Sequence, residues 1–204
     1  MKDKLEWLYK LIIVLVSGIG VYLNFKIFTV KGAIIYYTVQ SNLLCFVFYL
    51  AIVILMMSGK LKKDKVYYIF KGLVTMAIVI TMIVYQLFLA NTGAYDGHEF
   101  TSAIVHLIVP SLVIFDYLIF AEKGNLKKND PYIWSLSLVA YFVFYKVYTI
   151  MGGKFNDAGT CPYFFLSVDE MGYIGVIFSC LIIYIVFILF GKLVCFLDKR
   201  LKES

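Results

Sequence analysis

Six long apolar stretches divide the chain, and each is long enough for a helix to cross a lipid bilayer. They lie at residues 8–29, 33–57, 67–90, 103–121, 133–152 and 172–194. A bilayer core about 30 Å thick needs about 20 apolar residues in a helix. Because the stretches are continuously apolar rather than alternating, a transmembrane β-barrel is not expected. The sequence therefore predicts a single all-α domain, residues 1–204, built as a polytopic bundle of six transmembrane helices.

The composition excludes the other broad classes of protein. Of 204 residues, 62% are hydrophobic and 16% are charged. Ordinary soluble domains contain about 45–50% apolar and about 25% charged residues, so a soluble globular fold is excluded. A disordered chain needs low hydrophobicity and high charge, and is excluded too. Because the basic residues form short clusters between the apolar stretches, we expect no binding to nucleic acid.

The basic residues predict the orientation in the membrane. Three flank the spans on one side: Lys26, Lys31 and Lys154. Twelve flank them on the side that carries both termini: Lys2, Lys4, Lys60, Lys62, Lys63, Lys65, Lys123, Lys127, Lys128, Lys199, Arg200 and Lys202. Cytoplasmic loops of membrane proteins carry an excess of Lys and Arg. We therefore expect a multi-pass cell-membrane protein with cytoplasmic N- and C-termini.

Polar side chains inside the spans gather at one depth. With a helix rise of about 1.5 Å per residue, Thr38 lies about five residues below the outer edge of the second span, and His106 about three residues below the outer edge of the fourth. Gln86 and Lys146 lie near the outer ends of the third and fifth spans. Strongly polar groups inside a membrane normally face the bundle interior and often mark function. The sequence therefore predicts a polar site just beneath the outer surface.

The spacing of these polar residues suggests nucleophilic chemistry. Thr38, Ser41 and Asn42 share one helix face, and if that face meets His106, a hydroxyl lies beside an imidazole that can remove its proton. Amide or hydroxyl groups can donate hydrogen bonds to a developing oxyanion, and the candidates are Gln40, Ser41, Asn42 and Gln86. Two structural interpretations stay open. A membrane Thr commonly bonds the backbone one turn back, and Ser, Asn and Gln commonly join helices.

A second polar group lies deeper in the membrane. Asp116 follows His106 by ten residues, about 15 Å along the helix axis, so it cannot orient that imidazole. It lies at the depth of Lys71 and not far from Lys10. We interpret Asp116 and Lys71 as a structural ion pair, with a proton or ion relay as the functional alternative.

The external loops supply further candidates. The longest loop, residues 153–171, turns apolar from Tyr163 to Val168, as expected for a segment that returns toward the membrane or for an interfacial anchor. Lys146 has no carboxylate at its own depth, so we expect it to extend outward or to contact an anionic ligand. Acidic residues of the external loops are its candidate partners: Asp96, Glu99 and Asp169. The cysteines and histidines show no metal-ligand spacing, so no metal or other cofactor is expected.

Three segments resemble a known family. Residues 36–44, YYTVQSNLL, resemble the second-span motif of bacterial six-pass Pr6Pr-type membrane proteins, and residues 106–110, HLIVP, with Asp116 resemble their histidine span. Residues 162–166, PYFFL, with Asp169 resemble their Tyr-Pro-Phe-Leu-Asp loop, although Cys161 stands where that motif has its first Tyr, and extra residues precede Asp169.

That bacterial group is similar to the androgen-induced and androgen-dependent TFPI-regulating proteins. These are multi-pass membrane hydrolases that cleave fatty acid esters of hydroxy fatty acids with a Thr nucleophile and a His. The resemblance implies Thr38 as the nucleophile and His106 as its partner.

We therefore expect a hydrolase or acyl-transfer enzyme that acts on lipid or fatty-acid esters near the outer leaflet, with membrane lipids around it. Thr38 and His106 are the expected catalytic residues. The candidate substrate-binding residues are Gln40, Ser41, Asn42, Gln86, Lys146, Tyr163 and Asp169. The alternative is a non-enzymatic protein that binds or transports a small molecule or ion in the same polar cavity.

Overall fold

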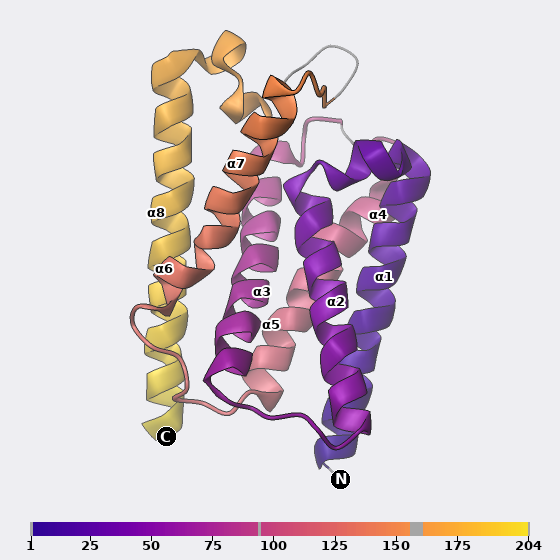
Figure 1. Cartoon of the computed structure of the whole chain (residues 1–204), viewed down its shortest axis with the longest axis vertical. Coiled ribbons are helices and arrows are strands. Elements are labelled where there is room, and N and C mark those ends of the chain that lie inside the picture. Colours follow the sequence, from indigo (N-terminus) through magenta and orange to yellow (C-terminus); the bar gives the residue numbers. More distant parts are fainter. Residues whose placement is uncertain (1, 94, 156–160, 204) are drawn as a thin grey trace.

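The computed structural model describes residues 2–93, 95–155 and 161–203 and shows a bundle of membrane-length helices (Figure 1). Six segments of the described chain are long and apolar enough to span a membrane: Asp3–Ile34, Tyr37–Met57, Lys65–Leu89, Glu99–Phe120, Asp130–Ile150 and Val168–Glu203. These ranges contain no strand. The predicted all-α class and the six spans are confirmed, with boundaries that shift by several residues.

The spans are built from regular helices and shorter helical turns. The α-helices are α1 (Lys2–Ile34), α2 (Tyr37–Met57), α3 (Lys65–Val84), α4 (Glu99–Ala103), α5 (Val109–Phe120), α6 (Asp130–Trp134), α7 (Leu136–Ile150) and α8 (Val168–Glu203). Two π-helical turns extend α3 and join α4 to α5: η1 (Tyr85–Leu89) and η2 (Ile104–Ile108). A 3₁₀ turn, η3 (Phe164–Leu166), precedes α8.

The main core lies between α1, α2, α3 and the η2–α5 span. It includes Ile13, Cys45, Tyr49, Ile78 and Val109, each at most 1% exposed. The helices α6, α7 and α8 lie on one side of this group (Figure 1), and α8 exposes most of its apolar side chains. Large exposed apolar side chains are expected where a helix meets lipid rather than water.

The connection between α1 and α2 re-enters the bundle. Thr29 adopts a left-handed conformation (φ 62°) that bends α1, and its hydroxyl accepts a hydrogen bond from the Gly32 N–H at 3.2 Å. The chain beyond the bend is buried at Ala33 and Ile35. The second span therefore begins at Tyr37, and the predicted start at residue 33 is wrong. The first residues of α2 therefore follow the re-entering connection directly, and no earlier turns of the same helix precede them.

The two termini lie at the same end of the bundle, together with the connection between α2 and α3 (Figure 1). This arrangement is the one that an even number of spans requires. The distribution of Lys and Arg predicts that this end faces the cytoplasm. The connections from α1 to α2 and from α7 to α8 lie at the opposite end.

Thiol labelling in intact cells tests this orientation. Cys161 is a half-exposed thiol in the connection between α7 and α8, whereas Cys195 is buried near the other end of α8. A membrane-impermeant maleimide should therefore modify Cys161 without permeabilisation, and the modification should disappear in the Cys161→Ser variant. Modification of Cys161 only after the membrane is permeabilised would reverse the predicted orientation.

Candidate active site

Thr38 and His106 lie in contact inside the bundle. The Thr38 Oγ1 is 3.4 Å from the His106 Nε2. Thr38 is 8% exposed and His106 is 2% exposed, so the contact is shielded from bulk solvent. Hydrogen bonds between catalytic groups are often long before substrate binds. The structure therefore brings together the two residues that the sequence singles out as nucleophile and base.

The other ring nitrogen of His106 fixes its tautomer. The Nδ1 lies 3.1 Å from the Ser102 carbonyl oxygen and 3.2 Å from the Ser102 hydroxyl. A carbonyl oxygen only accepts hydrogen bonds, so the Nδ1 carries the hydrogen of the neutral ring. The Nε2 lone pair then faces the Thr38 hydroxyl. In this tautomer His106 is arranged to accept the hydroxyl proton.

A local break in helical regularity positions the imidazole. Pro110 has no N–H to donate to the carbonyl of His106, four residues earlier. The chain widens there into η2, in which the Val109 N–H bonds the Ile104 carbonyl. Gly20 on α1 allows this widened segment to approach closely, because a Cβ at that position would lie 2.9 Å from the side chains of Ile104 and Val105. Such π-turns frequently occur at functional sites.

Aromatic rings hold the imidazole on two sides. Tyr85, the first residue of η1, stacks on His106 with 3.6 Å between ring centroids and 9° between planes. Tyr95 meets the same ring edge-on at 5.3 Å and 85°. The Tyr95 hydroxyl donates to the Oδ1 of the buried Asn24 at 2.7 Å, and Ser102 donates to the Tyr85 hydroxyl at 2.6 Å. The imidazole therefore has little freedom to rotate away from Thr38.

Ser41 and Asn42 anchor the backbone of Thr38. The Ser41 hydroxyl donates to the Thr38 carbonyl at 3.0 Å, and the Asn42 amide donates to it at 2.8 Å. The same amide donates to the Val105 carbonyl at 3.2 Å and so joins α2 to η2. Neither residue lines the cavities at Thr38. The two residues predicted as oxyanion donors therefore hold the backbone of Thr38 instead.

Tyr163 supplies a hydroxyl at the start of α2. Its oxygen accepts a hydrogen bond from the Tyr37 N–H at 3.1 Å. Burial raises the pKa of Tyr163 to about 12. The phenol therefore stays protonated at neutral pH, and Tyr163 lines both cavities that Thr38 lines.

The apolar segment after Tyr163 packs against the bundle. Phe165 and Leu166, in η3, are buried beside Tyr37 and Ile35. The predicted segment from Tyr163 to Val168 thus lies against the helices, in the part of the α7–α8 connection that the structure describes. Residues 156–160 of that loop lie outside the described residues.

Two cavities meet at Thr38 and Tyr163. The first, here called the polar cavity, has a volume of about 680 Å³ and is also lined by His106, Asp169 and Glu170. The second, the apolar cavity, has a volume of about 470 Å³ and lies between α3, α7, α8 and η3. Its lining is almost entirely aliphatic and aromatic, with Leu138, Phe142, Leu166 and Ile177 among the residues. One cavity is thus partly polar and the other apolar, and Thr38 lines both.

Five predicted binding residues line neither cavity: Ser41, Asn42, Gln40, Gln86 and Lys146. Gln40 donates to the Ile34 carbonyl at 2.9 Å, and Gln86 is exposed within η1. The Lys146 ammonium lies 4.9 Å from the centre of the Tyr145 ring. We expected Lys146 to reach an acidic side chain, and this expectation is wrong within the part of the chain that the structure describes. The salt bridges found there are formed by other lysines. Asp169, the remaining candidate, lines the polar cavity.

Four residues of the site have no place in the sequence-based prediction. Ser102 lies four residues before His106, so helical spacing alone could have indicated its contact with the imidazole. Asn24 is a polar residue near the outer end of the first span, and the same depth argument could have included it. Tyr85 and Tyr95 meet His106 only through the tertiary arrangement, and no local pattern signals them.

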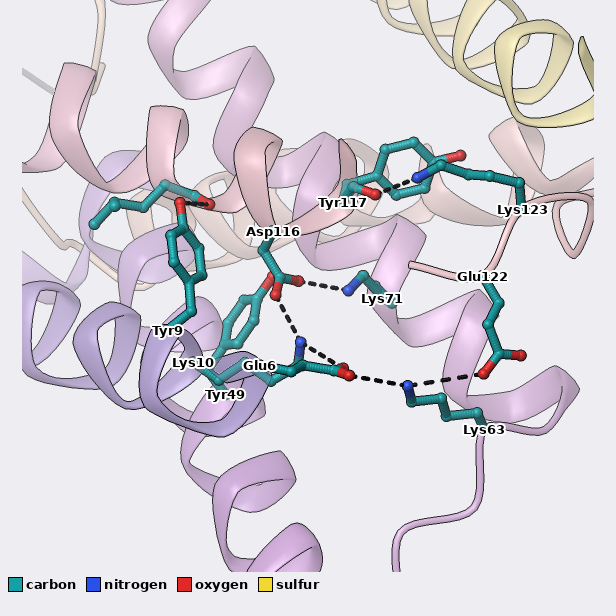
Figure 2. A network of polar contacts seen from close by, with 11 residues as sticks. Glu6, Tyr9, Lys10, Tyr49, Lys63, Lys71, Asp116, Tyr117, Glu122 and Lys123 are labelled. Carbon is teal, nitrogen blue, oxygen red and sulfur yellow. Dashed lines mark hydrogen bonds and ion pairs between the residues drawn. The ribbon is translucent and has the colours of Figure 1, made fainter. Parts of the chain in front are cut away.

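Asp116 forms the predicted ion pair and a further one. Its carboxylate is 2.5 Å from the Lys71 ammonium and 2.6 Å from the Lys10 ammonium (Figure 2). Tyr49 donates to the same carboxylate at 3.0 Å, and Glu6 pairs with Lys10 at 2.9 Å. The Asp116 and Lys71 side chains are thus in ion-pair contact. The network lies toward the end of the bundle that carries the termini, away from Thr38.

A hydroxyl, an imidazole and a phenol come together at Thr38, His106 and Tyr163. Among the residues that the structure describes, no three His, Cys, Asp or Glu side chains gather closely enough to hold a metal ion. A comparison of the chain with protein-family models, with curated proteins and with solved structures found no match.

Proposed function

We propose that this protein is a membrane-embedded hydrolase of lipid or fatty-acid esters, with Thr38 as nucleophile and His106 as general base. The observation that carries the proposal is the contact between the Thr38 hydroxyl and the unprotonated Nε2 of His106. The resemblance of residues 36–44 and 106–110 to the Pr6Pr-type motifs supports the same pair of residues. A hydroxyl becomes an effective nucleophile when an oriented base lies within hydrogen-bond reach.

The reaction proceeds in two stages. The Thr38 oxygen attacks the acyl carbon while its proton passes to the His106 Nε2. The Tyr163 hydroxyl donates to the resulting oxyanion, and the alcohol leaves with the proton from His106. A water molecule then attacks the acyl–Thr38 ester, gives one proton to His106 and releases the fatty acid as Thr38 regains its proton. Transfer to another alcohol in place of water gives the acyl-transfer variant.

The two cavities suggest how the substrate lies. The apolar cavity suits the acyl chain, since burying a methylene group away from water contributes about 0.8 kcal/mol. The polar cavity then receives the alcohol portion, and the ester lies between them at Thr38. With cytoplasmic termini, this site opens toward the outer leaflet of the cell membrane. An ester near the headgroup boundary lies at a comparable depth.

Labelling with a fluorophosphonate tests the nucleophile. The probe should modify the purified protein in detergent at Thr38, as located by mass spectrometry of the digested protein, and Thr38→Ala should abolish the modification. Thr75→Ala is a matched control, because Thr75 is also a buried Thr of a spanning helix and lines neither cavity. It should be modified like the wild type.

Two outcomes would contradict the proposal. Labelling that persists in Thr38→Ala would remove Thr38 as the nucleophile. Absence of labelling and of turnover with every lipid ester tested, together with saturable binding of a small molecule, would favour the non-enzymatic alternative that the sequence left open.

A further inference from the structure

Aromatic rings form much of the wall of the polar cavity. The rings of Phe28, Tyr36, Tyr85, Tyr95, Tyr163 and Phe164 line it. They contact one another: Phe28 meets Tyr95 edge-on at 5.5 Å, and Tyr36 meets Tyr163 edge-on at 6.0 Å. A ring face is negative and attracts a cation placed over it.

The charged side chains that line the polar cavity are negative, like the faces of the aromatic rings. Asp169 and Glu170 line it, and both are exposed. The salt bridges within the described part of the chain use neither carboxylate, because all of them involve Glu6, Asp116 or Glu122. The described residues that line the cavity include no Lys or Arg. A cleft lined by one sign of charge with apolar walls concentrates ligands of the opposite sign.

We infer that the polar cavity selects esters whose alcohol portion carries a positive charge, such as a quaternary ammonium group. The inference rests on the proposed function, because it names the substrate class for the same Thr38 site. A compact cation gains from the ring faces and from both carboxylates at once. An alcohol portion that carries a carboxylate would meet two like charges and no described cation. The inference therefore departs from the hydroxy fatty acid esters that the family resemblance implies.

Matched substrates measure this selectivity directly. Palmitoylcholine and 3,3-dimethylbutyl palmitate share the acyl chain and the shape of the alcohol, but only the choline ester is charged. The purified wild-type protein should hydrolyse palmitoylcholine with a kcat/KM about tenfold higher than that of the uncharged ester, as expected for a cation over partly desolvated rings. A palmitate ester of a hydroxystearic acid, whose alcohol portion is anionic, should be the poorest of the three.

Charge variants assign the selectivity to the cavity. The double variant Asp169→Asn/Glu170→Gln should lower the ratio of the two kcat/KM values about threefold, since only the ring faces remain to attract the cation. Asp96→Asn is the matched control: it removes an exposed negative charge from the connection between η1 and α4, and Asp96 does not line the cavity. The ratio should stay at the wild-type value in this control.

Each result decides between the two proposals. Equal kcat/KM values for the charged and uncharged esters would overturn the inference and leave the hydrolase proposal standing, because both esters are cleaved. Preference for the anionic ester, or an equal loss of selectivity in Asp96→Asn and in the double variant, would also overturn the inference. Failure to cleave any of the three esters, with no fluorophosphonate labelling, would overturn the proposed function and the inference with it.

Discussion

Replacing His106 with Gln should lower kcat for ester hydrolysis about 10²- to 10⁴-fold, which is the usual contribution of a general base. The expectation follows from the geometry: the Nε2 of His106 faces the Thr38 hydroxyl at 3.4 Å, while the Nδ1 is held by Ser102. Gln fills a similar volume and forms hydrogen bonds, but its amide does not accept a proton at neutral pH. The KM should change much less than kcat, because the lost interaction acts in the transition state.

His98 provides a matched control for this variant. It is the other histidine of the chain and lies exposed just before α4, outside the lining of both cavities. Steady-state kinetics of His98→Gln should match the wild type, and thermal unfolding of His106→Gln in detergent should show a folded protein. A folded His106→Gln variant that keeps more than about a tenth of the wild-type kcat would contradict the role of His106 as base.

The helices and their number were predictable because they depend on local properties. Continuous apolar stretches of about 20 residues have few alternatives to a spanning helix. The pairing of Thr38 with His106 was predictable for a related reason, since axial depth follows from counting residues along each span. The residue count correctly brought Thr38 and His106 to the same level of the bundle, although the second span begins at Tyr37, later than predicted.

Rotation about each helix axis was less predictable. Gln40 follows Thr38 by two residues, which is about 200° around an α-helix, so it faces away from the nucleophile at nearly the same depth. Gln86 lies in the π-turn η1, where the 3.6-residue period does not apply. Pro110 signals the π-turn η2 in the sequence, but no nearby residue signals η1 in the same way. The roles of Tyr85 and Tyr95 depend on how separate helices pack, and a single sequence does not encode that in any short pattern.

Replacing Asp116 with Asn should destabilise the fold by about 3–5 kcal/mol, as expected when one partner of a buried charge pair is removed. Asp116 is fully buried, and Lys10 and Lys71 are 0% and 2% exposed. Without the carboxylate, two ammonium groups stay in the bundle with one buried carboxylate, that of Glu6. Reversible unfolding in mixed micelles, compared with the wild type, measures the loss. A change of less than about 1 kcal/mol would contradict a stabilising role for the network.

An apolar replacement of the whole cluster separates stability from function. A quadruple variant removes the ion pairs without leaving a lone charge among the substituted residues: Lys10→Met, Tyr49→Phe, Lys71→Met and Asp116→Leu. Glu6 keeps Lys63, whose ammonium lies 3.3 Å from its carboxylate (Figure 2). Because apolar residues of similar volume often replace a buried ion pair at no cost, we expect this variant to recover most of the stability lost in Asp116→Asn. It should also hydrolyse esters at the wild-type rate, since the network lies far from Thr38 along the bundle. A variant that is stable but inactive would instead favour the relay, because only a functional role of these charges would then explain the loss.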